Sequence, residues 1–264
     1  MTDELLCAVQ EGVATIKLNR PEVMNAFSDD MRAALHDSLV SLGTRDDVGC
    51  IVITGSGKAF CAGGDIASMV ALQDAGDISV INRRVVESGR VLQQLRQTRQ
   101  PVLAAINGAA AGAGINLALA CDMRLASSTA IFSESFVKIG LVPDWGGFQS
   151  LTRLVGTAKA MELMMTGDRF DAAEADRLGL LNRVIPAEGF AVEVDTFARR
   201  LANGPRAALE VIKRGVYLGE TESAENVLDF EVREQKRLFL SNDAREGMRA
   251  FMEKRLAIFG QGGV

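Results

Sequence analysis

Two segments rich in glycine and alanine are the parts of this sequence best suited to chemistry. The first, residues 59–66 (AFCAGGDI), follows an apolar run at 50–54, and the second, residues 107–114 (NGAAAGAG), follows another at 101–106. Side chains this small leave the main chain uncovered, so a substrate can approach it closely and peptide N–H groups stay free to donate. Two such donors that converge on one oxygen form an oxyanion hole, which stabilises an enolate or a tetrahedral anion made from a carbonyl group.

Each of these segments is expected as a turn at the end of a strand, within a pattern of alternating strands and helices. Strands are predicted over 5–9, 12–19, 50–54, 102–106 and 122–126, with a short extended piece at 131–132. Helices are predicted after Ser28, over 80–98 and over 115–120, the first with an apolar stripe of Met31, Leu35, Leu39 and Leu42. Strands and helices that alternate at this spacing predict parallel βαβ units with both faces of the sheet covered.

The chain beyond about residue 145 is predicted to be mostly helical. The helical segments are 146–154, 157–166, 171–178, 187–202, 205–217, 221–240 and 242–258, with one strand over 181–185. The stretch 67–79 has no clear pattern and is predicted to be a mobile loop.

Composition narrows the class of protein. The 264 residues are 48% apolar and 24% charged, as is usual for a globular protein, and the net charge of −5 argues against a nucleic-acid partner. The four cysteines have no paired spacing, and the acidic N-terminus has no secretory pattern, so reduced thiols and a cytoplasmic location are expected. The uncharged stretch between Arg99 and Asp122 contains Pro101, asparagines and glycines, which indicates buried core and no membrane partner.

Several short motifs occur along the chain in a characteristic order and spacing. They are Asn19-Arg20-Pro21, Asn25-Ala26-Phe27, 59–66, 107–114, Ala120-Cys121-Asp122, 140–147, Arg245-Glu246-Gly247 and 250–255. Over nearly its whole length the chain therefore resembles the crotonase, or enoyl-CoA hydratase/isomerase, superfamily, most closely its enoyl-CoA isomerase and phenylacetate-pathway ring-epoxide isomerase branch. The resemblance implies an α/β fold with a crotonase-like spiral of ββα units over 1–200. It also implies a helical C-terminal region over 201–264, used for trimer assembly and CoA contact.

The same resemblance implies the substrate and its contacts. An acyl-CoA thioester is expected, with coenzyme A as part of the substrate and no separate cofactor, bound by a homotrimer or a dimer of trimers. The oxyanion donors are expected to be the backbone N–H groups of Gly64 and Ala113. The predicted substrate-binding residues are Val23, Met24, Ala26, Ala62, Gly63, Asp65, Ile66, Asn116, Phe136, Trp145, Phe251 and Lys254, the last two acting from an adjacent subunit.

The resemblance also bears on which reaction is catalysed. Family hydratases use two glutamates to hold one water, and the matching positions here are Asn116 and Phe136, neither of which transfers a proton. Asp144 matches the active-site aspartate of the isomerase branch. One carboxylate in an apolar pocket can take a proton from C2 and return it at C4 while the N–H donors hold the dienolate.

For several of these residues the sequence also offers a structural role as the alternative to a catalytic one. Asp144 precedes two glycines and a helix, so it is a candidate N-cap. Glu134 shares a strand face with Phe136 if this stretch is extended, and it is either a displaced acid or base or a solvated or structurally paired carboxylate. Asn116 either orients a water or substrate carbonyl or bonds to backbone. Cys61 is expected to line the pocket because no histidine lies near it in sequence. The sole histidine, His36, excludes His-rich metal sites, and no metal is expected.

The leading hypothesis is an enoyl-CoA isomerase with Asp144 as acid and base. The alternatives are an enoyl-CoA hydratase (a lyase) that uses Asp144 and a water ordered by Asn116, and an acyl-CoA-binding protein without catalysis.

Overall fold

The computed structural model describes residues 3–76 and 78–260, so predictions that involve residues 1–2 and 261–264 lie outside the described residues. The strands are β1 (Leu5–Gln10), β2 (Val13–Leu18), β3 (Cys50–Gly55), β4 (Ala59–Cys61), β5 (Val102–Ile106), β6 (Ala109–Ala111), β7 (Met123–Ser127), β8 (Ile131–Ser133), β9 (Phe170–Asp171) and β10 (Arg183–Ile185). The helices are α1 (Asp29–Gly43), α2 (Ile66–Ala75), α3 (Ile78–Gln97), α4 (Ala113–Ala120), α5 (Gly147–Thr166), α6 (Ala172–Arg177), α7 (Phe190–Ala202), α8 (Arg206–Gly219), α9 (Ala224–Phe239) and α10 (Asn242–Glu253). Short 3-10 turns lie at η1 (Pro21–Val23), η2 (Ser135–Ile139) and η3 (Ala187–Gly189).

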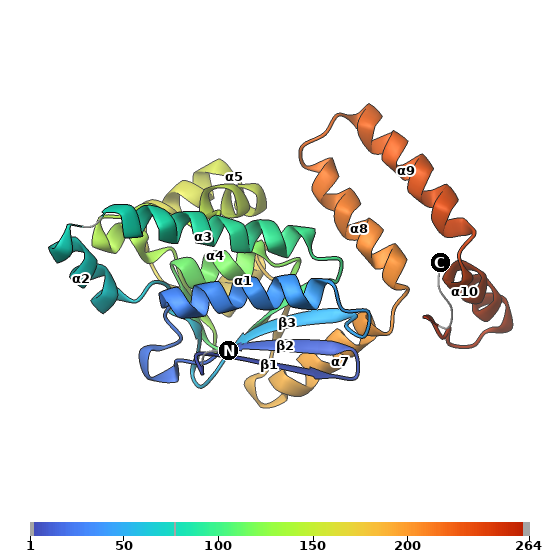
Figure 1. The fold of residues 1–264 in the computed structure, drawn as a ribbon, viewed down its shortest axis with the longest axis horizontal. Coiled ribbons are helices and arrows are strands. Elements are labelled where there is room, and N and C mark those ends of the chain that lie inside the picture. The colour runs from blue at the N-terminus through green and yellow to red at the C-terminus, as the bar shows by residue number, and fades with distance from the viewer. Residues whose placement is uncertain (1–2, 77, 261–264) are drawn as a thin grey trace.

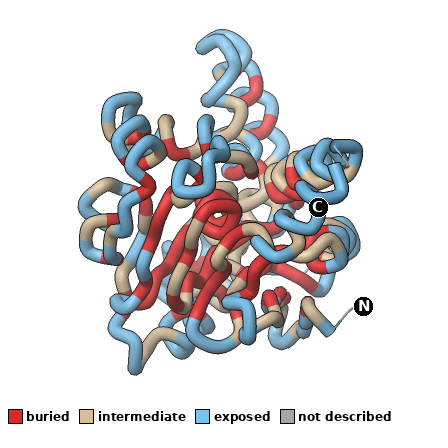
Figure 2. Tube along the Cα trace, turned by 90° about the vertical axis from the view of Figure 1, so that its left-hand side faces the viewer, coloured by how far each residue is buried: buried red, intermediate tan, exposed pale blue. Residues whose placement is uncertain are grey.

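The main sheet has six strands in the order β1-β2-β3-β5-β7-β10. Figure 1 shows β1, β2 and β3 below α1, and Figure 2 shows that the backbone at the centre of the molecule is buried. β1 is antiparallel to β2 and the other pairs are parallel. Successive side chains of a strand point to opposite faces, so Ile51 and Ile53 pack with α1 while Cys50 and Val52 pack with α7. Helices on both faces explain why the central strands are apolar throughout, which confirms the predicted βαβ arrangement.

The first helix forms where its cap and apolar stripe predict. The Ser28 hydroxyl accepts a hydrogen bond from the N–H of Met31 (3.0 Å), which satisfies one donor of the first turn. The four apolar residues of the stripe are buried between the sheet and α3. Arg84 of α3 donates to Asp29 (2.6 Å), which joins the two helices at the end that faces the candidate site.

The small-residue segments are not simply turns, and this corrects the sequence prediction. Each contains a short strand, β4 or β6, and these belong to a second sheet in the order β4-β6-β8-β9. β4 pairs with β6 and β6 pairs with β8, both in parallel. Small side chains let these strands lie close to the helices packed on them, and the second sheet brings the two segments together.

Other boundaries also differ from the predicted ones. The expected mobile loop over 67–79 is mostly helix α2, because Asp65 caps it by accepting from the N–H of Ser68 (3.2 Å). By contrast, the two predicted helices over 146–154 and 157–166 are both present, as the two parts of α5, and they meet at a kink where Gly156 has a positive φ (75°). The last helix stops at Glu253, before the predicted end, since Lys254 adopts a left-handed conformation.

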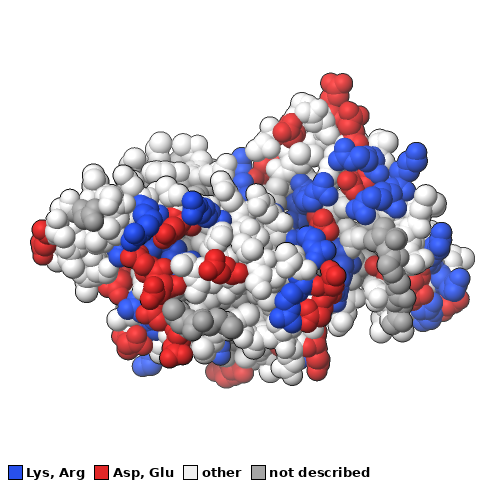
Figure 3. Space-filling model, in the orientation of Figure 1, with Lys and Arg blue, Asp and Glu red and all other residues white. Residues whose placement is uncertain are grey.

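Helices α8, α9 and α10 extend away from the sheet at one end of the molecule (Figure 1). α8 is attached by the buried Lys213, whose ammonium group donates to the carbonyls of Leu95 (2.7 Å) and Gln100 (3.1 Å) and pairs with Asp122 (2.8 Å). On the face drawn in Figure 3, lysines and arginines gather over this end of the molecule among acidic residues. The predicted domain boundary at residue 200 stays a prediction.

Candidate active site

The two small-residue segments lie against each other at the centre of the candidate site. Ala59 pairs with Ala109 and Cys61 with Ala110 in the parallel ladder. Gly63 follows with a φ of +100°, and a Cβ atom on it would lie 2.9 Å from the carbonyl oxygen of Ala111 and 3.4 Å from the nitrogen of Ala113. Only glycine therefore fits where the first segment approaches the start of α4.

The predicted oxyanion donors, the N–H groups of Gly64 and Ala113, are both free. Gly64 forms a parallel bridge with Phe27. That bridge uses the carbonyl of Gly63 (2.8 Å) and the N–H of Asp65 (3.4 Å), so the N–H of Gly64 points away from Phe27. Ala113 is the first residue of α4, where N–H groups have no intrahelical acceptor. Within the described residues neither N–H donates a hydrogen bond.

The two segments predicted to bind CoA are also adjacent. The N–H of Ala62 donates to the carbonyl of Met24 (2.9 Å). Arg20 donates to the carbonyl of Ala26 (2.8 Å) and pairs with Asp65 (3.0 Å). The Asp65 carboxylate thus holds the two segments together and caps α2. The N–H of Ser68 and the guanidinium of Arg20 lower its pKa.

The exposed residues of these segments form an open edge beside the free donors. Val23, Met24 and Ile66 are exposed at this edge. Met24 has a left-handed backbone at the end of η1, with its N–H bonded to the carbonyl of Pro21.

Asp144 is not a helix cap, which excludes the structural alternative for this residue. The residue before α5 is Gly146, and no side chain caps the helix. The main-chain carbonyl of Asp144 accepts from the N–H of Gly147 (3.0 Å) and from Nδ2 of Asn116 (2.9 Å). Its carboxyl oxygen Oδ1 is buried without a partner in the described part of the chain. Burial raises the pKa of Asp144 to about 6, against the lowering effect of Arg32.

The loop that carries Asp144 is held on both sides. The ring of Trp145 stacks on Phe27 with centroids 4.4 Å apart, and the residue has a positive φ of 49°. On the other side, a Cβ on Gly147 would lie 2.3 Å from Nδ2 of Asn116, so only glycine allows the asparagine to reach the loop. Asn116 is buried, and its hydrogen bond to the main-chain carbonyl of Asp144 fixes the backbone that carries the Asp144 carboxylate.

Glu134 is the residue whose importance the sequence understated. Its side chain is fully buried, and both carboxyl oxygens lack a hydrogen-bond partner among the residues described. Burial raises its pKa to about 8, the nearby amide of Asn116 opposes this, and the charge of Asp144 adds to it. A structurally paired carboxylate would show a partner here.

The chain beside Glu134 is also not a continuous strand. β8 ends at Ser133 and η2 begins at Ser135, so Glu134 and Phe136 do not share a strand face. Phe136 is buried, and a Cβ on Gly112 would lie 3.7 Å from its ring. The sequence signal for Glu134 was its expected place on the same strand face as Phe136, and the structure does not bear out that placement.

Three further residues singled out from the sequence are Cys61, which is buried, and Phe251 and Lys254, which lie far from the two donor segments. Cys61 is buried, and burial raises its pKa to about 12, so its thiol is protonated and is no nucleophile. Phe251 and Lys254 lie in and just after α10, at the far end of the molecule, and Phe251 is 83% exposed. The structure of one chain does not bring them to the site.

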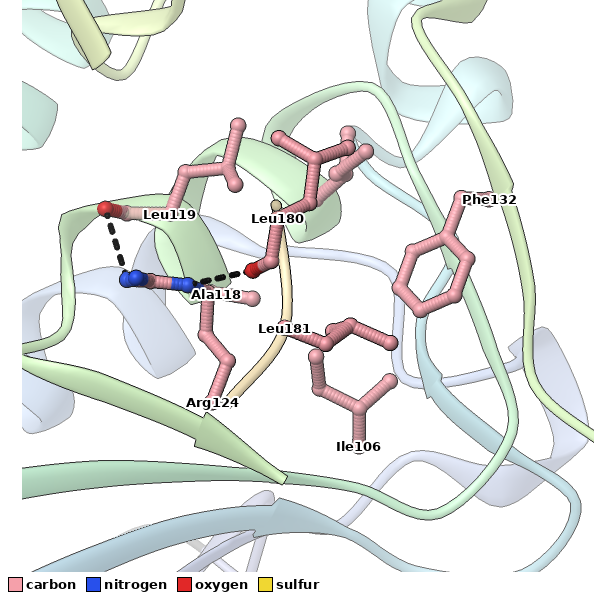
Figure 4. A pocket seen from close by; sticks show the side chains of 8 residues that line it. Ile106, Ala118, Leu119, Arg124, Phe132, Leu180 and Leu181 are labelled. Carbon is pink, nitrogen blue, oxygen red and sulfur yellow. Dashed lines mark hydrogen bonds between the residues drawn. The ribbon is translucent and has the colours of Figure 1, made fainter. Parts of the chain in front are cut away.

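Figure 4 shows a second, apolar pocket, which is lined in part by residues of α4. Its lining is Ile106, Ile115, Ala118, Leu119, Arg124, Phe132, Leu180 and Leu181. Arg124 donates to the carbonyls of Leu180 (2.7 Å) and Leu119 (3.4 Å), so its cation is already bonded to the protein. The lining carries no acid or base for proton transfer, and we assign no substrate to this pocket.

Among residues 3–76 and 78–260, no helix is both long and apolar enough to cross a bilayer. Over the same ranges, no cluster of His, Cys, Asp and Glu side chains is placed to hold a metal ion.

Comparison with known proteins shows what this arrangement resembles. The family model described as "Enoyl-CoA hydratase/isomerase" matches residues 8–262. The chain is 41% identical to a "Probable enoyl-CoA hydratase" of Rhodobacter capsulatus, over 94% of each chain. It is 37% identical to the "1,2-epoxyphenylacetyl-CoA isomerase" of Escherichia coli, over 97% of each. The crystal structure of an enoyl-CoA hydratase from Polaromonas sp. JS666 superposes with a TM-score of 0.93 at 32% identity, covering 97% of this chain and 99% of that one. The predicted fold is therefore confirmed.

Proposed function

The chain belongs to the enoyl-CoA hydratase/isomerase family, whose members act on acyl-CoA thioesters, and we propose that it is an enoyl-CoA isomerase. Family membership confirms the resemblance read from the motifs. The proposed reaction moves a β,γ double bond to the α,β position, or rearranges an activated ring, through a thioester enolate.

One observation supports this choice most directly. The Asp144 carboxyl group, whose oxygen Oδ1 is buried without a partner in the described part of the chain, lies in a loop that Asn116 ties to α4, the helix whose first N–H is free. The hydratase positions hold Asn116 and Phe136, which cannot transfer protons. The chain therefore has a base close to two free donors, without the usual pair of glutamates.

The proposed mechanism follows from these groups. The thioester oxygen accepts from the N–H groups of Gly64 and Ala113, and the Asp144 carboxylate removes a proton from C2. The negative charge of the dienolate moves onto the oxygen, where each donor is worth about 10²–10³ in rate. Protonation at C4 then completes the shift. A pKa of about 6 suits this base, since it is ionised at neutral pH and still basic.

Substrate binding in this proposal uses the paired segments of the first half of the chain. CoA lies along Val23–Ala26 and residues 62–66, with its thioester between the two donors. Phe136 and Trp145 supply apolar surface around the acyl group. Phe251 and Lys254 contact the nucleotide of a neighbouring subunit in a homotrimer or a dimer of trimers.

A hydratase is the second candidate, and one specific observation favours it. Asn116, Glu134 and Asp144 carry buried oxygens without partners, and such a site suits an ordered water. Most of the similar curated relatives are also called enoyl-CoA hydratase. An acyl-CoA-binding protein without catalysis is the third alternative.

The test compares wild type with Asp144→Asn on two substrates. Isomerisation of a trans-3-enoyl-CoA increases the ultraviolet absorbance of the conjugated thioester, and hydration of crotonyl-CoA decreases it. We expect an increase with the first substrate and little change with the second. Asp144→Asn should lower C2 deuterium exchange by about 10²–10⁴-fold, with acyl-CoA binding retained.

The matched control is Asp168→Asn, which changes an exposed carboxylate paired with Lys138 and should leave the rate unchanged. Retained exchange in Asp144→Asn would remove this residue from the mechanism. Rapid loss of crotonyl-CoA absorbance would favour the hydratase, and binding without any C2 exchange would favour the non-catalytic protein.

A further inference from the structure

Most of the buried polar side-chain atoms that lack a partner are gathered in one place. In the described part of the chain these atoms belong to Arg32, Gln100, Asn116, Glu134 and Asp144. The last three residues are neighbours, because Asn116 donates to the main chain of Asp144 and both residues influence the pKa of Glu134. All of their unpaired atoms are oxygens, so the cluster has no donor unless one of its carboxyl groups is protonated.

Two carboxyl groups in such a setting do not both ionise readily. Burial without hydrogen bonds disfavours the charge on each, and the two negative charges repel each other. The stable state therefore carries one proton. That proton supplies the donor that the cluster of oxygens lacks.

The surroundings decide which carboxyl group keeps the proton. Arg32 of α1 is buried and acts on Asp144, and it favours the carboxylate form there. Asn116 partly favours the charge on Glu134, but no cation is among the groups that act on that residue. Asp144 is thus the carboxylate and Glu134 the neutral acid.

We propose that Glu134 is a second catalytic residue, which donates the proton to C4 after Asp144 has removed the proton from C2. This inference rests on the proposed isomerase function. In this mechanism two residues share the proton transfer. A base removes the C2 proton and a separate acid protonates C4, whereas in the simpler mechanism one carboxylate does both.

The proton transfers balance over one turnover. Asp144 gains the C2 proton as the C2–H bond breaks, and the electron pair passes to the thioester oxygen. The electron pair then moves from the thioester oxygen along the conjugated acyl group to C4. A C4–H bond forms there as the O–H bond of Glu134 breaks. Asp144 is left neutral and Glu134 ionised, and one proton passing from Asp144 to Glu134, directly or through a water, restores the starting state.

Isotope labelling of the wild-type protein tests the proposal without any mutation. A 3-enoyl-CoA deuterated at C2 is converted in ordinary water in a single turnover, with the protein in excess over the substrate, and the product is analysed at C4 by mass spectrometry or NMR. We expect no deuterium at C4, since the proton delivered there comes from Glu134. Transfer of the C2 label to C4 would show a single base and overturn the proposal.

Glu134→Gln gives the second test, because glutamine keeps the shape and cannot donate a proton of this acidity. We expect turnover to fall by about 10²–10⁴-fold, while C2 exchange stays within about tenfold of wild type. Glu234→Gln is the control, since it changes a glutamate of α9 that pairs with Arg237. Wild-type turnover in folded Glu134→Gln would overturn the proposal.

The two proposals fail in different ways. If Asp144→Asn retains C2 exchange, the isomerase mechanism itself is wrong. If Asp144→Asn loses exchange and Glu134→Gln retains full turnover, only the role of Glu134 is wrong.

Discussion

Two carboxyl groups of the same chemical type acquire different properties from their neighbours in this protein. Burial raises the pKa of both, to about 6 for Asp144 and about 8 for Glu134. Arg32 opposes the shift only at Asp144, and the charge of Asp144 itself adds to the shift at Glu134. Pairs of groups with separated pKa values are the usual basis of acid and base assignments.

The pH dependence of activity follows from this separation. Below about pH 6 the base is protonated, so turnover should fall about tenfold per pH unit. Above about pH 8 the acid has lost its proton, so turnover should fall again. The measurement is the initial rate of isomerisation from pH 5 to about 9.5 in buffers of equal ionic strength.

Glu134→Gln provides the control for this profile. Its C2 exchange should depend on the ionisation of Asp144 alone and show no decline on the alkaline side. An alkaline decline that persists in this variant would assign that limb to another group.

At the scale of elements, the start of α4 is placed by close contact with β4. Gly114 lies in the first turn of the helix, and a Cβ on it would lie 2.1 Å from the carbonyl oxygen of Cys61 and 2.8 Å from its carbonyl carbon. Both atoms are backbone, so the contact cannot be relieved by a side-chain rotation. The position of the Ala113 donor relative to the first segment therefore depends on a glycine that makes no chemical contribution of its own.

Gly114→Ala should move the helix away from β4 and separate the two donors. We expect a loss of about 1–3 kcal/mol in the free energy of unfolding and a greater loss of C2 exchange than of acyl-CoA binding. Urea unfolding and the exchange assay measure the two effects.

Gly89→Ala is the matched control, because a Cβ at this glycine of α3 meets no atom within 4 Å. Because alanine has a higher helix propensity than glycine, the free energy of unfolding of this variant should rise by up to about 1 kcal/mol, and its C2 exchange should be unchanged. Equal stability of the two variants would contradict the proposed contact.

At the scale of the whole molecule, the C-terminal helices of a single chain leave many large apolar side chains exposed to solvent. The exposed apolar residues of α9 and α10 and the turn between them include Leu228, Val232, Phe239, Leu240, Met248 and Met252. Contiguous apolar surface of this kind usually marks an interface between proteins. It agrees with the proposed homotrimer, in which α10 reaches a neighbouring site.

Val232→Glu should weaken that assembly. Val232 is 70% exposed on α9, so a charge there is harmless to a single chain and unfavourable within an apolar interface. We expect light scattering to show trimers or hexamers for wild type and smaller species for the variant. Glu231→Gln, an exposed change in the same helix, should leave the mass unchanged, and a wild-type mass for Val232→Glu would exclude this face from the interface.

The sequence by itself determined the class of fold, the family and the location of the two donor segments. Continuous apolar runs predicted β3 and β5, and a helical apolar stripe predicted α1, because these elements are set by apolar side chains close together in the chain. The short strands β4 and β6 were missed, since each is stabilised by a partner far away in sequence. Helix α2 was missed because none of its residues is buried, so it has no buried apolar stripe.

Only the tertiary structure decided the roles of the two carboxyl groups. From local sequence Asp144 was an equally good helix cap, and it ceased to be one when the cap position proved to be Gly146. Glu134 was an ordinary polar residue until the fold buried it without a partner, next to Asp144 and Asn116. A pKa depends on burial and on charges brought together from distant parts of the chain, and sequence spacing does not contain that information.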